Sequence, residues 1–298
     1  MTARALKVVD EQTDAAASDA AREARGEALQ RAGKGGSPKR RPDAAAGGWH
    51  RFVIDVWITN LNFTEFGIYK QSRNRAKSRQ FTSDMDIFAE VIEDGERTGL
   101  LGYREDLWTK AQGMDRRLVF KLFSENLNWR ATMDLMVGRS LQQTIGARGL
   151  PVMTYSINTD DDNFNIYLER SANKWPLLPE SFSFFLIDDK HKPAFYRLRR
   201  DVFAVGGDYT LYDQRGAMVG HLDGKVFSLG GKWKGMVRAG HADKSLMTVM
   251  KLFGAMLVFN GSCRRHMRRL WEDVGSGKLK PEIERQEADL YLNPRRIR

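Results

Sequence analysis

The longest apolar run in the chain is LMTVMKLFGAMLVF, at residues 246–259. Thr248, Lys251 and Gly254 are its only interruptions, so a helix of this sequence is apolar on nearly every side and belongs inside a protein core. The run is shorter than the roughly 20 apolar residues that a membrane-spanning helix needs. We therefore expect a buried helix rather than a membrane anchor.

Residues on both sides of this run define the expected ends of the helix. Asp243 is a suitable N-cap because its carboxylate can accept a backbone N–H of the first turn. The helix is expected to continue or restart over 262–274, and Gly275 and Gly277 end it. The central helix is thus predicted over about 243–274.

Short apolar segments separated by Gly, Asp and Asn fill the chain from 81 to 238, and 51–58 is either a strand or a short helix. The predicted strands are 87–92, 98–103, 118–123, 129–137, 153–157, 164–168, 182–187, 194–199, 201–205, 209–212, 217–222, 225–229 and 232–238. Asp94-Gly95 and Asp223-Gly224 are predicted hairpin turns. Strands at this spacing indicate an antiparallel sheet or barrel rather than parallel strands joined by helices.

The two ends of the chain differ from the middle. Residues 1–48 are rich in Ala, Gly and charged residues, so we expect a disordered tail. A single folded domain is predicted over 49–274, followed by a charged extension over 275–298. The pattern leaves open whether 49–170 completes the same barrel or forms a separate unit.

Two stretches resemble a known repeat. Residues 209–234, YTLYDQRGAMVGHLDGKVFSLGGKWK, are similar to the repeat of the LURP-one-related proteins, and 182–200, FSFFLIDDKHKPAFYRLRR, looks like an earlier copy. That family is grouped with the tubby C-terminal domain and the phospholipid scramblases. In that superfamily an antiparallel β-barrel closes around one central hydrophobic helix, so the resemblance implies a tubby C-terminal-like barrel here.

The physics of a barrel agrees with this implication. A wide barrel needs a filled interior, and a helix apolar on all sides fills it without stranding a polar face. Gly254 allows a close approach of the helix to a barrel strand. Lys251 then has to reach the barrel mouth or find a carboxylate inside.

Composition narrows the setting and the class of partner. The chain has 298 residues, a formal net charge of +10 and one cysteine, Cys263. A lone cysteine and the lack of a signal-like segment favour a reducing, intracellular location, and we expect the cytoplasm. The resemblance adds peripheral association at a membrane as an alternative setting. The positive charge favours an anionic partner: nucleic acid, acidic lipid or an acidic protein. The alternative is that the charge serves solubility alone.

Basic residues gather in three sets. The first is Lys70, Arg73, Arg75, Lys77 and Arg79; the second is Lys190, Lys192, Arg197, Arg199 and Arg200; the third is Arg264, Arg265, Arg268 and Arg269. The third set also complements the dipole at a helix C-terminus, which is a sufficient structural reason for it. Tubby-like domains bind phosphoinositides through a basic patch, so the resemblance implies that the first two sets bind anionic headgroups.

This reasoning predicts a non-enzymatic module that binds anionic phospholipid, or associates with membranes in a scramblase-like way. Scramblase activity itself is the weaker version, because no membrane-spanning helix is predicted. The alternatives are a nucleic-acid-binding protein that stacks bases on Trp and Tyr, and a protein-interaction scaffold. The oligomeric state is not predicted.

Catalytic and metal signals are sparse. The chain has no GxSxG or Walker sequence, its five histidines show no paired zinc spacing, and no cofactor is predicted. Asp160, Asp162 and Asn163 lie in an acidic stretch that resembles the calcium-binding segment of scramblases, although it precedes the helix by a long way. The ordinary interpretation of this stretch is a polar turn. An enzyme that binds an acidic metabolite in a barrel mouth is a further alternative.

Overall fold

The computed structural model describes residues 48–56, 85–161, 164–172, 178–187, 192–202, 207–225, 231–283 and 287–288. All of them belong to one compact unit, Gly47–Arg298. The tail predicted over 1–48 lies outside the described residues except for Gly48, as does the whole basic set between Lys70 and Arg79.

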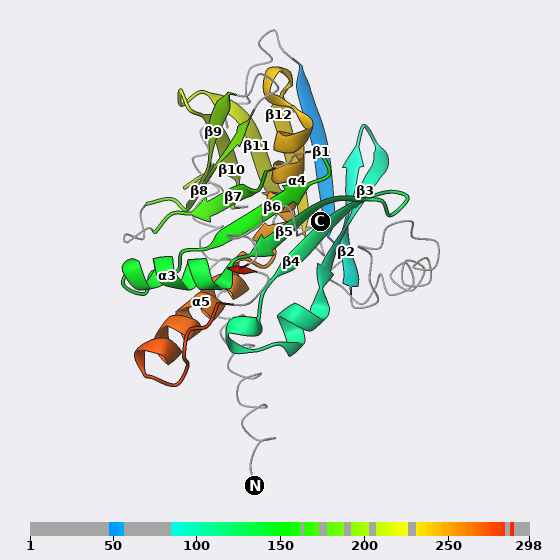
Figure 1. The fold of residues 1–298 in the computed structure, drawn as a ribbon. Coiled ribbons are helices and arrows are strands. Elements are labelled where there is room, and N and C mark those ends of the chain that lie inside the picture. The colour runs from blue at the N-terminus through cyan, green and yellow to red at the C-terminus, as the bar shows by residue number, and fades with distance from the viewer. Residues whose placement is uncertain are drawn as a thin grey trace, which may run out of the picture. The chain divides into compact units, whose positions relative to one another are not determined.

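Twelve antiparallel strands form a closed barrel (Figure 1). The first six are β1 (Trp49–Val56), β2 (Met85–Glu93), β3 (Glu96–Arg104), β4 (Val119–Ser124), β5 (Trp129–Leu135) and β6 (Thr154–Thr159). The others are β7 (Ile166–Arg170), β8 (Ser181–Ile187), β9 (Pro193–Arg200), β10 (Tyr209–Asp213), β11 (Met218–Lys225) and β12 (Lys232–Arg238). Strands adjacent in sequence are adjacent in the wall, and β1 closes it by pairing with both β2 and β12.

The predicted apolar helix is α4 (Lys244–Leu257), and the barrel wall surrounds it. Phe253 packs edge-on against Phe182 of β8 and Tyr209 of β10, with ring centroids 5.1 Å apart in both pairs. The next residue, Gly254, faces β1, where a Cβ would lie 2.5 Å from Cδ1 of Ile54. Contacts in different directions from successive residues place the helix inside the barrel. The prediction of a barrel closed around a central hydrophobic helix is confirmed.

Two polar residues of the helix region behave as the sequence suggests. Asp243 is the N-cap of α4, and its Oδ1 accepts the backbone N–H of Leu246 at 2.7 Å. Lys251, inside the apolar run, donates from Nζ to Oε2 of Glu93 at 2.9 Å, beside the β2–β3 turn. The carboxylate removes the cost of burying an unpaired charge.

The helix predicted over 243–274 consists of two helices. After α4 the chain turns at Val258 and Phe259, and α5 (Asn260–Gly275) starts at an angle of 71°. The Phe259 ring packs against Phe88, Tyr103, Trp108 and Phe120 at this bend. Aromatic packing on the Phe259 ring therefore accompanies the change of direction.

Helix α5 packs against α3 (Val137–Gly146), a helix that the hydrophobic pattern does not predict. The connection between β3 and β4 adds the short helices η3 (Asp106–Lys110) and η4 (Gly113–Asp115), and η5 (Ala239–His241) precedes α4. Among the described helices, none is long and apolar enough to cross a membrane alone; only the bent pair α4–α5, taken together, reaches that length and composition.

Two predicted turns have different outcomes. The turn at Asp94-Gly95 is confirmed, with φ of 52° and 87° at the two residues between β2 and β3. The turn at Asp223-Gly224 is wrong, because β11 runs straight through it and Gly224 pairs with Trp233 of β12. A glycine tolerates an ordinary ladder position as well as a turn, so the dipeptide alone is ambiguous.

The segment predicted as a strand over 201–205 also differs. Asp201 and Val202 lie just after the end of β9, and 203–206 lie outside the described residues. The β9–β10 connection brings Asp201 opposite Asp208, whose carbonyl oxygen accepts the Asp201 N–H at 2.8 Å.

Candidate functional site

The outer surface of β8 and β9 carries exposed apolar and basic side chains together. Along β9 the side chains alternate, so Tyr196 and Leu198 face the core while Phe195, Arg197 and Arg199 are exposed. The outward positions Phe185 and Ile187 of β8 are exposed in the same way. We call these five residues, Phe185, Ile187, Phe195, Arg197 and Arg199, the β8–β9 face.

The strand register brings the apolar members of this face together. Phe185 lies directly opposite Phe195, and Ile187 lies opposite Pro193. Phe185 is 49% exposed and Phe195 is 37% exposed. Directly opposed residues of one sheet face are neighbours, so these side chains form one apolar area on the barrel wall.

The two arginines border this apolar area. The Arg197 guanidinium lies 5.9 Å from the centre of the Phe195 ring. Within the described part of the chain, neither Arg197 nor Arg199 forms an ion pair. A groove of about 300 Å³ runs beside them, and it is lined by Phe195, Arg197, Arg199, Tyr212, Asp213, Gln214 and Gly216. Both arginines therefore border the apolar area and line this groove.

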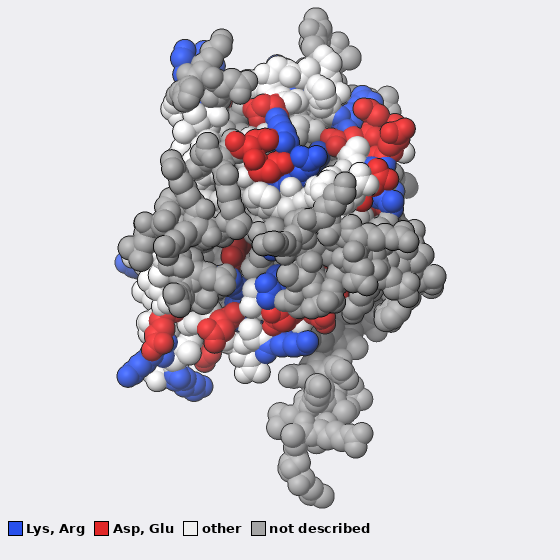
Figure 2. Space-filling model, turned by 45° about the vertical axis from the view of Figure 1, so that its right-hand side comes forward, with Lys and Arg blue, Asp and Glu red and all other residues white. Residues whose placement is uncertain are grey.

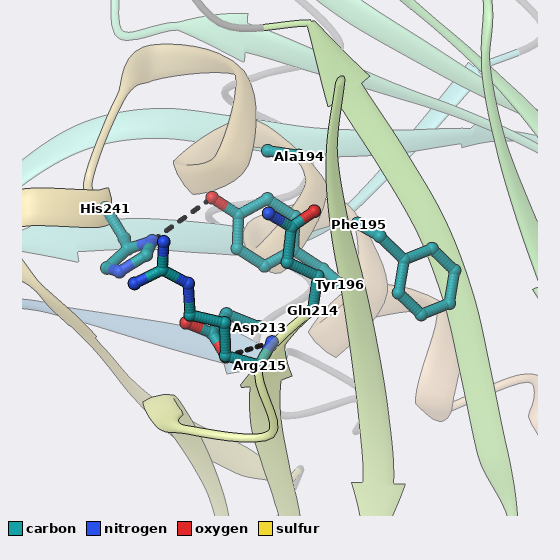
Figure 3. A pocket seen from close by; sticks show the side chains of 7 residues that line it. All are labelled: Ala194, Phe195, Tyr196, Asp213, Gln214, Arg215 and His241. Atoms are coloured by element: carbon teal, nitrogen blue, oxygen red, sulfur yellow. Dashed lines mark hydrogen bonds between the residues drawn. The ribbon is translucent and has the colours of Figure 1, made fainter. Parts of the chain in front are cut away.

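A second hollow of about 260 Å³ shares Phe195, Asp213 and Gln214 with this groove. Figure 3 shows its lining residues, with Tyr196 and His241 joined by a 3.3 Å contact between the phenol oxygen and Nδ1. Asp213 accepts the backbone N–H groups of Arg215 and Ala217, so its carboxylate holds the β10–β11 turn. Among the described residues, the lining of this hollow therefore contains a polar pair and a turn.

The other predicted members of the second basic set are placed differently. Arg200 pairs in register with the inward-facing Tyr209, and its Nη2 would lie 3.5 Å from a Cβ added to Gly207. Arg200 therefore lies over the β9–β10 connection and not beside Arg197. Lys192 is exposed just before β9, and Lys190 lies outside the described residues.

Described basic residues are mixed with acidic ones on one face of the molecule. On the face in Figure 2, the Lys and Arg residues lie beside Asp and Glu residues. Of the third set, Arg264 is half-buried, and Arg170 and Glu180 inside the protein are the charged residues that affect its pKa most. Burial lowers the pKa of Arg264, which indicates a structural position.

The acidic stretch after β6 forms ion pairs. Asp160 lies 2.9 Å from Nη1 of Arg130 and 3.2 Å from Nζ of Lys244, and Asp161 also pairs with Lys244. These contacts hold the end of β6 against the start of α4. Asp162 and Asn163 lie outside the described residues, so the calcium site predicted there stays a prediction.

A buried ionic cluster holds the junction between the wall and α5. Glu180 forms an ion pair with Arg170 and accepts hydrogen bonds from the Tyr209 hydroxyl, at 2.8 Å, and the Asn260 amide. Burial opposes ionisation of Glu180, but Arg170 and the hydrogen bonds outweigh it and lower the pKa. All four side chains are buried, so this cluster stabilises the fold and is not accessible to a ligand.

Cys263 is inert for a similar reason. Its side chain is fully buried in α5, and burial raises the pKa of the thiol to about 12. The neighbouring arginines in sequence therefore do not produce a reactive thiolate.

Comparison with known proteins adds nothing to this description, since no family model, curated protein or solved structure matches the chain. The function therefore has to be argued from the geometry.

The sequence analysis did not single out the apolar residues of the β8–β9 face, although the alternation in FSFFLI indicates which of them face outward. Phe185 and Ile187 have the opposite phase to the buried residues at 182, 184 and 186.

Proposed function

We propose that this barrel is a non-enzymatic, tubby-like module that binds anionic phospholipid at a membrane surface through the β8–β9 face. The observation that carries the proposal is the opposed pair Phe185–Phe195 with Arg197 and Arg199 beside it. The resemblance to tubby-like and LURP-one-related proteins supports the same class of ligand.

Each half of the face suits a different layer of the membrane. Exposed phenylalanine rings lower their free energy by entering the boundary between headgroups and acyl chains. Arginine side chains next to them lie at the level of the phosphates, which a guanidinium binds in a bidentate way. Each cation near an anionic leaflet contributes about 1 kcal/mol, so binding is expected to be reversible and sensitive to salt.

Nucleic acid is the second candidate, because exposed aromatic rings beside arginines can also stack bases. The strand register favours lipid, since Ile187 and Pro193 extend the apolar area and offer nothing to a base. The two ligands are distinguished in the experiment below.

Sedimentation with vesicles tests the proposal. The full chain is mixed at low salt with phosphatidylcholine vesicles that contain or lack phosphatidylserine. We expect it to pellet with the anionic vesicles. Arg197→Gln with Arg199→Gln should weaken this binding roughly 30-fold, since two cations contribute about 2 kcal/mol. Phe185→Ser with Phe195→Ser should weaken binding at both low and high salt.

The matched control is Arg268→Gln with Arg269→Gln, which removes two exposed charges from α5 and should bind as the wild type does. If this control loses as much binding as the Arg197/Arg199 variant, net charge and not the β8–β9 face is responsible. Tighter binding to single-stranded RNA or DNA than to anionic vesicles, lost in the phenylalanine variant, would assign the face to nucleic acid.

A further inference from the structure

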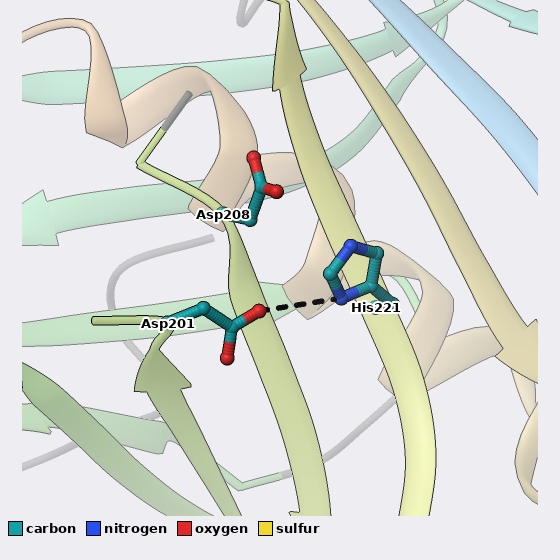
Figure 4. A group of neighbouring side chains, drawn as sticks. All are labelled: Asp201, Asp208 and His221. Atoms are coloured by element: carbon teal, nitrogen blue, oxygen red, sulfur yellow. Dashed lines mark ion pairs between the residues drawn. The ribbon is translucent and has the colours of Figure 1, made fainter. Parts of the chain in front are cut away.

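A second constellation lies farther along the barrel wall, at the connection between β9 and β10. Asp201 follows β9, Asp208 precedes β10, and His221 projects from β11 (Figure 4). Each offers one ligand atom, and the three atoms lie within 4.8 Å of one another. The spacing of these residues in the sequence does not indicate a metal site, because the β9–β10 connection and the register of β10 with β11 bring them together.

Neighbouring donors already orient the side chains of this group. Asp208 is 4% exposed, and its Oδ1 accepts the backbone N–H of Gly224 at 3.1 Å. The Thr210 hydroxyl lies 3.0 and 3.1 Å from the two carboxylate oxygens of Asp201 and 3.4 Å from Nδ1 of His221. Contacts of this kind fix ligand orientation in metal sites.

The charge and access of the group also suit a cation. Two carboxylates stand beside one imidazole, and Nδ1 of His221 is 3.8 Å from Oδ2 of Asp201. The side chains of His221 and Asp201 are 23% and 35% exposed, so an ion and a water molecule can reach them. Arg200 lies over Gly207, and Arg199 pairs in register with Thr210, so these two cations partly offset the charge of the two carboxylates.

We propose that Asp201, Asp208 and His221 bind one divalent transition-metal ion of the zinc class. An imidazole nitrogen with two carboxylates is a zinc-type ligand set, whereas calcium and magnesium prefer oxygen ligands in greater number. Three protein ligands leave the fourth tetrahedral position to water. Metal–ligand distances of about 2.0–2.1 Å place tetrahedral ligands roughly 3.3 Å apart, so the side chains draw together when the ion binds.

The test is zinc titration of the tag-free full chain, after treatment with a chelator, by isothermal calorimetry. We expect one Zn²⁺ per chain. Asp208→Asn keeps an acceptor for the Gly224 N–H, and His221→Ala removes a partly exposed ring. Each should weaken zinc binding roughly 100-fold or more, which is at least the loss expected when a residue that only hydrogen-bonds to a metal ligand is replaced. Far-UV circular dichroism confirms that each variant is folded.

Cobalt gives an independent readout, because tetrahedral Co²⁺ absorbs visible light when imidazole and carboxylates bind it. This absorption should appear in the wild type and be absent in His221→Ala. The matched control is His241→Ala, which removes a different histidine on the same chain and should leave both signals unchanged. No binding to the wild type, or equal losses in the His221 and His241 variants, would overturn the proposal.

This inference does not depend on lipid binding. Titrations contain no vesicles, and Arg197→Gln alone should bind zinc as the wild type does. Failure of the vesicle experiment therefore leaves the metal proposal standing, and failure of the titration leaves the lipid proposal standing.

Discussion

At the scale of single residues, His266 has an unusual environment for an imidazole. It is 6% exposed on α5, packs against Trp108, and its Nε2 lies 2.9 Å from the Arg116 carbonyl oxygen. Burial, with a smaller contribution from the Arg116 and Arg269 charges, lowers the pKa from 6.5 to about 4. The folded protein therefore keeps this ring neutral while the unfolded chain protonates it.

This difference predicts how stability depends on pH. Between pH 6.5 and about 4 the unfolded state binds one more proton at this residue, so acidification lowers the free energy of unfolding through that window. The total contribution is about 3 kcal/mol, at 1.36 kcal/mol for each pKa unit. His266→Gln keeps a donor for the Arg116 carbonyl and does not titrate, so its stability should approach that of the wild type as the pH falls.

Urea unfolding at a series of pH values measures this convergence. His50→Gln is the control, because it replaces an exposed histidine on β1. The free energy of unfolding of this variant should differ from that of the wild type by a constant amount at every pH. A constant gap between the wild type and His266→Gln from pH 7.5 to 4 would show that His266 is not responsible.

The residues predictable from the sequence are those with local causes. Asp243 was predictable as a cap because its partner lies three positions away. Lys251 was predictable as a charge that needs a carboxylate, but Glu93 as that carboxylate was not, since 158 positions separate them. The positions of His266, Glu180 and His221 depend on strand register and on the bend before α5, which no local pattern encodes.

At the scale of elements, α3 shows why the sequence pattern can fail to predict a helix. Its N-cap, Met136, makes no side-chain capping bond. The cap comes from Glu287, whose carboxylate oxygens accept the backbone N–H groups of Gly138 and Arg139 at 2.8 Å each. An acceptor 149 positions away leaves no local N-terminal signal.

Glu287→Gln should therefore lower the free energy of unfolding by about 1–2 kcal/mol, because a charged acceptor at a helix N-terminus is partly replaced by a neutral one. Thermal melts followed by circular dichroism measure the change. Glu282→Gln alters an exposed carboxylate nearby in the same segment and should melt with the wild type. Equal melting of all three proteins would mean that α3 does not need this cap.

The β8–β9 face also belongs to this scale, and two of its five members were singled out in the sequence. Arg197 and Arg199 were singled out as basic residues, but charge counting could not separate them from Arg200, which strand alternation places elsewhere. The phase of a strand decides which side chains share a surface. Turn dipeptides are a weaker guide: Asp94-Gly95 ends a strand, whereas Asp223-Gly224 continues one.

At the scale of the whole molecule, a barrel closed around a central helix was predicted, and the strand pair that closes the wall was not. Short connections predict only that consecutive strands are neighbours in the wall. The pairing of β1 with β12 is a contact between the two ends of the barrel sequence, and the uncertainty between strand and helix at 51–58 left it unassigned. Only the register of Trp49 with Arg238 shows that the sheet has no free edge.

Closure predicts a sharp difference between two shortened chains. A chain that starts at Gly47 retains the whole compact unit and should unfold as the full chain does. A chain that starts at Trp57 lacks β1, which removes Phe52, Ile54 and Val56 from the core and exposes the edges of β2 and β12. It should lose cooperative unfolding and bind hydrophobic dyes. Identical urea unfolding curves for the two chains would contradict a structural role for β1.

The closed wall also sets an order of events in time. During synthesis the first strand of the wall emerges long before its partner β12, and the helix that fills the interior emerges later still. Until then nothing covers the inward-facing apolar side chains of the growing sheet, so a ribosome-bound chain exposes hydrophobic surface and unpaired strand edges. Closure of the barrel and insertion of α4 are therefore late steps that depend on contacts between residues far apart in sequence, which makes folding slow. Chains that end prematurely cannot complete these steps, so we expect chaperones and proteases to bind them.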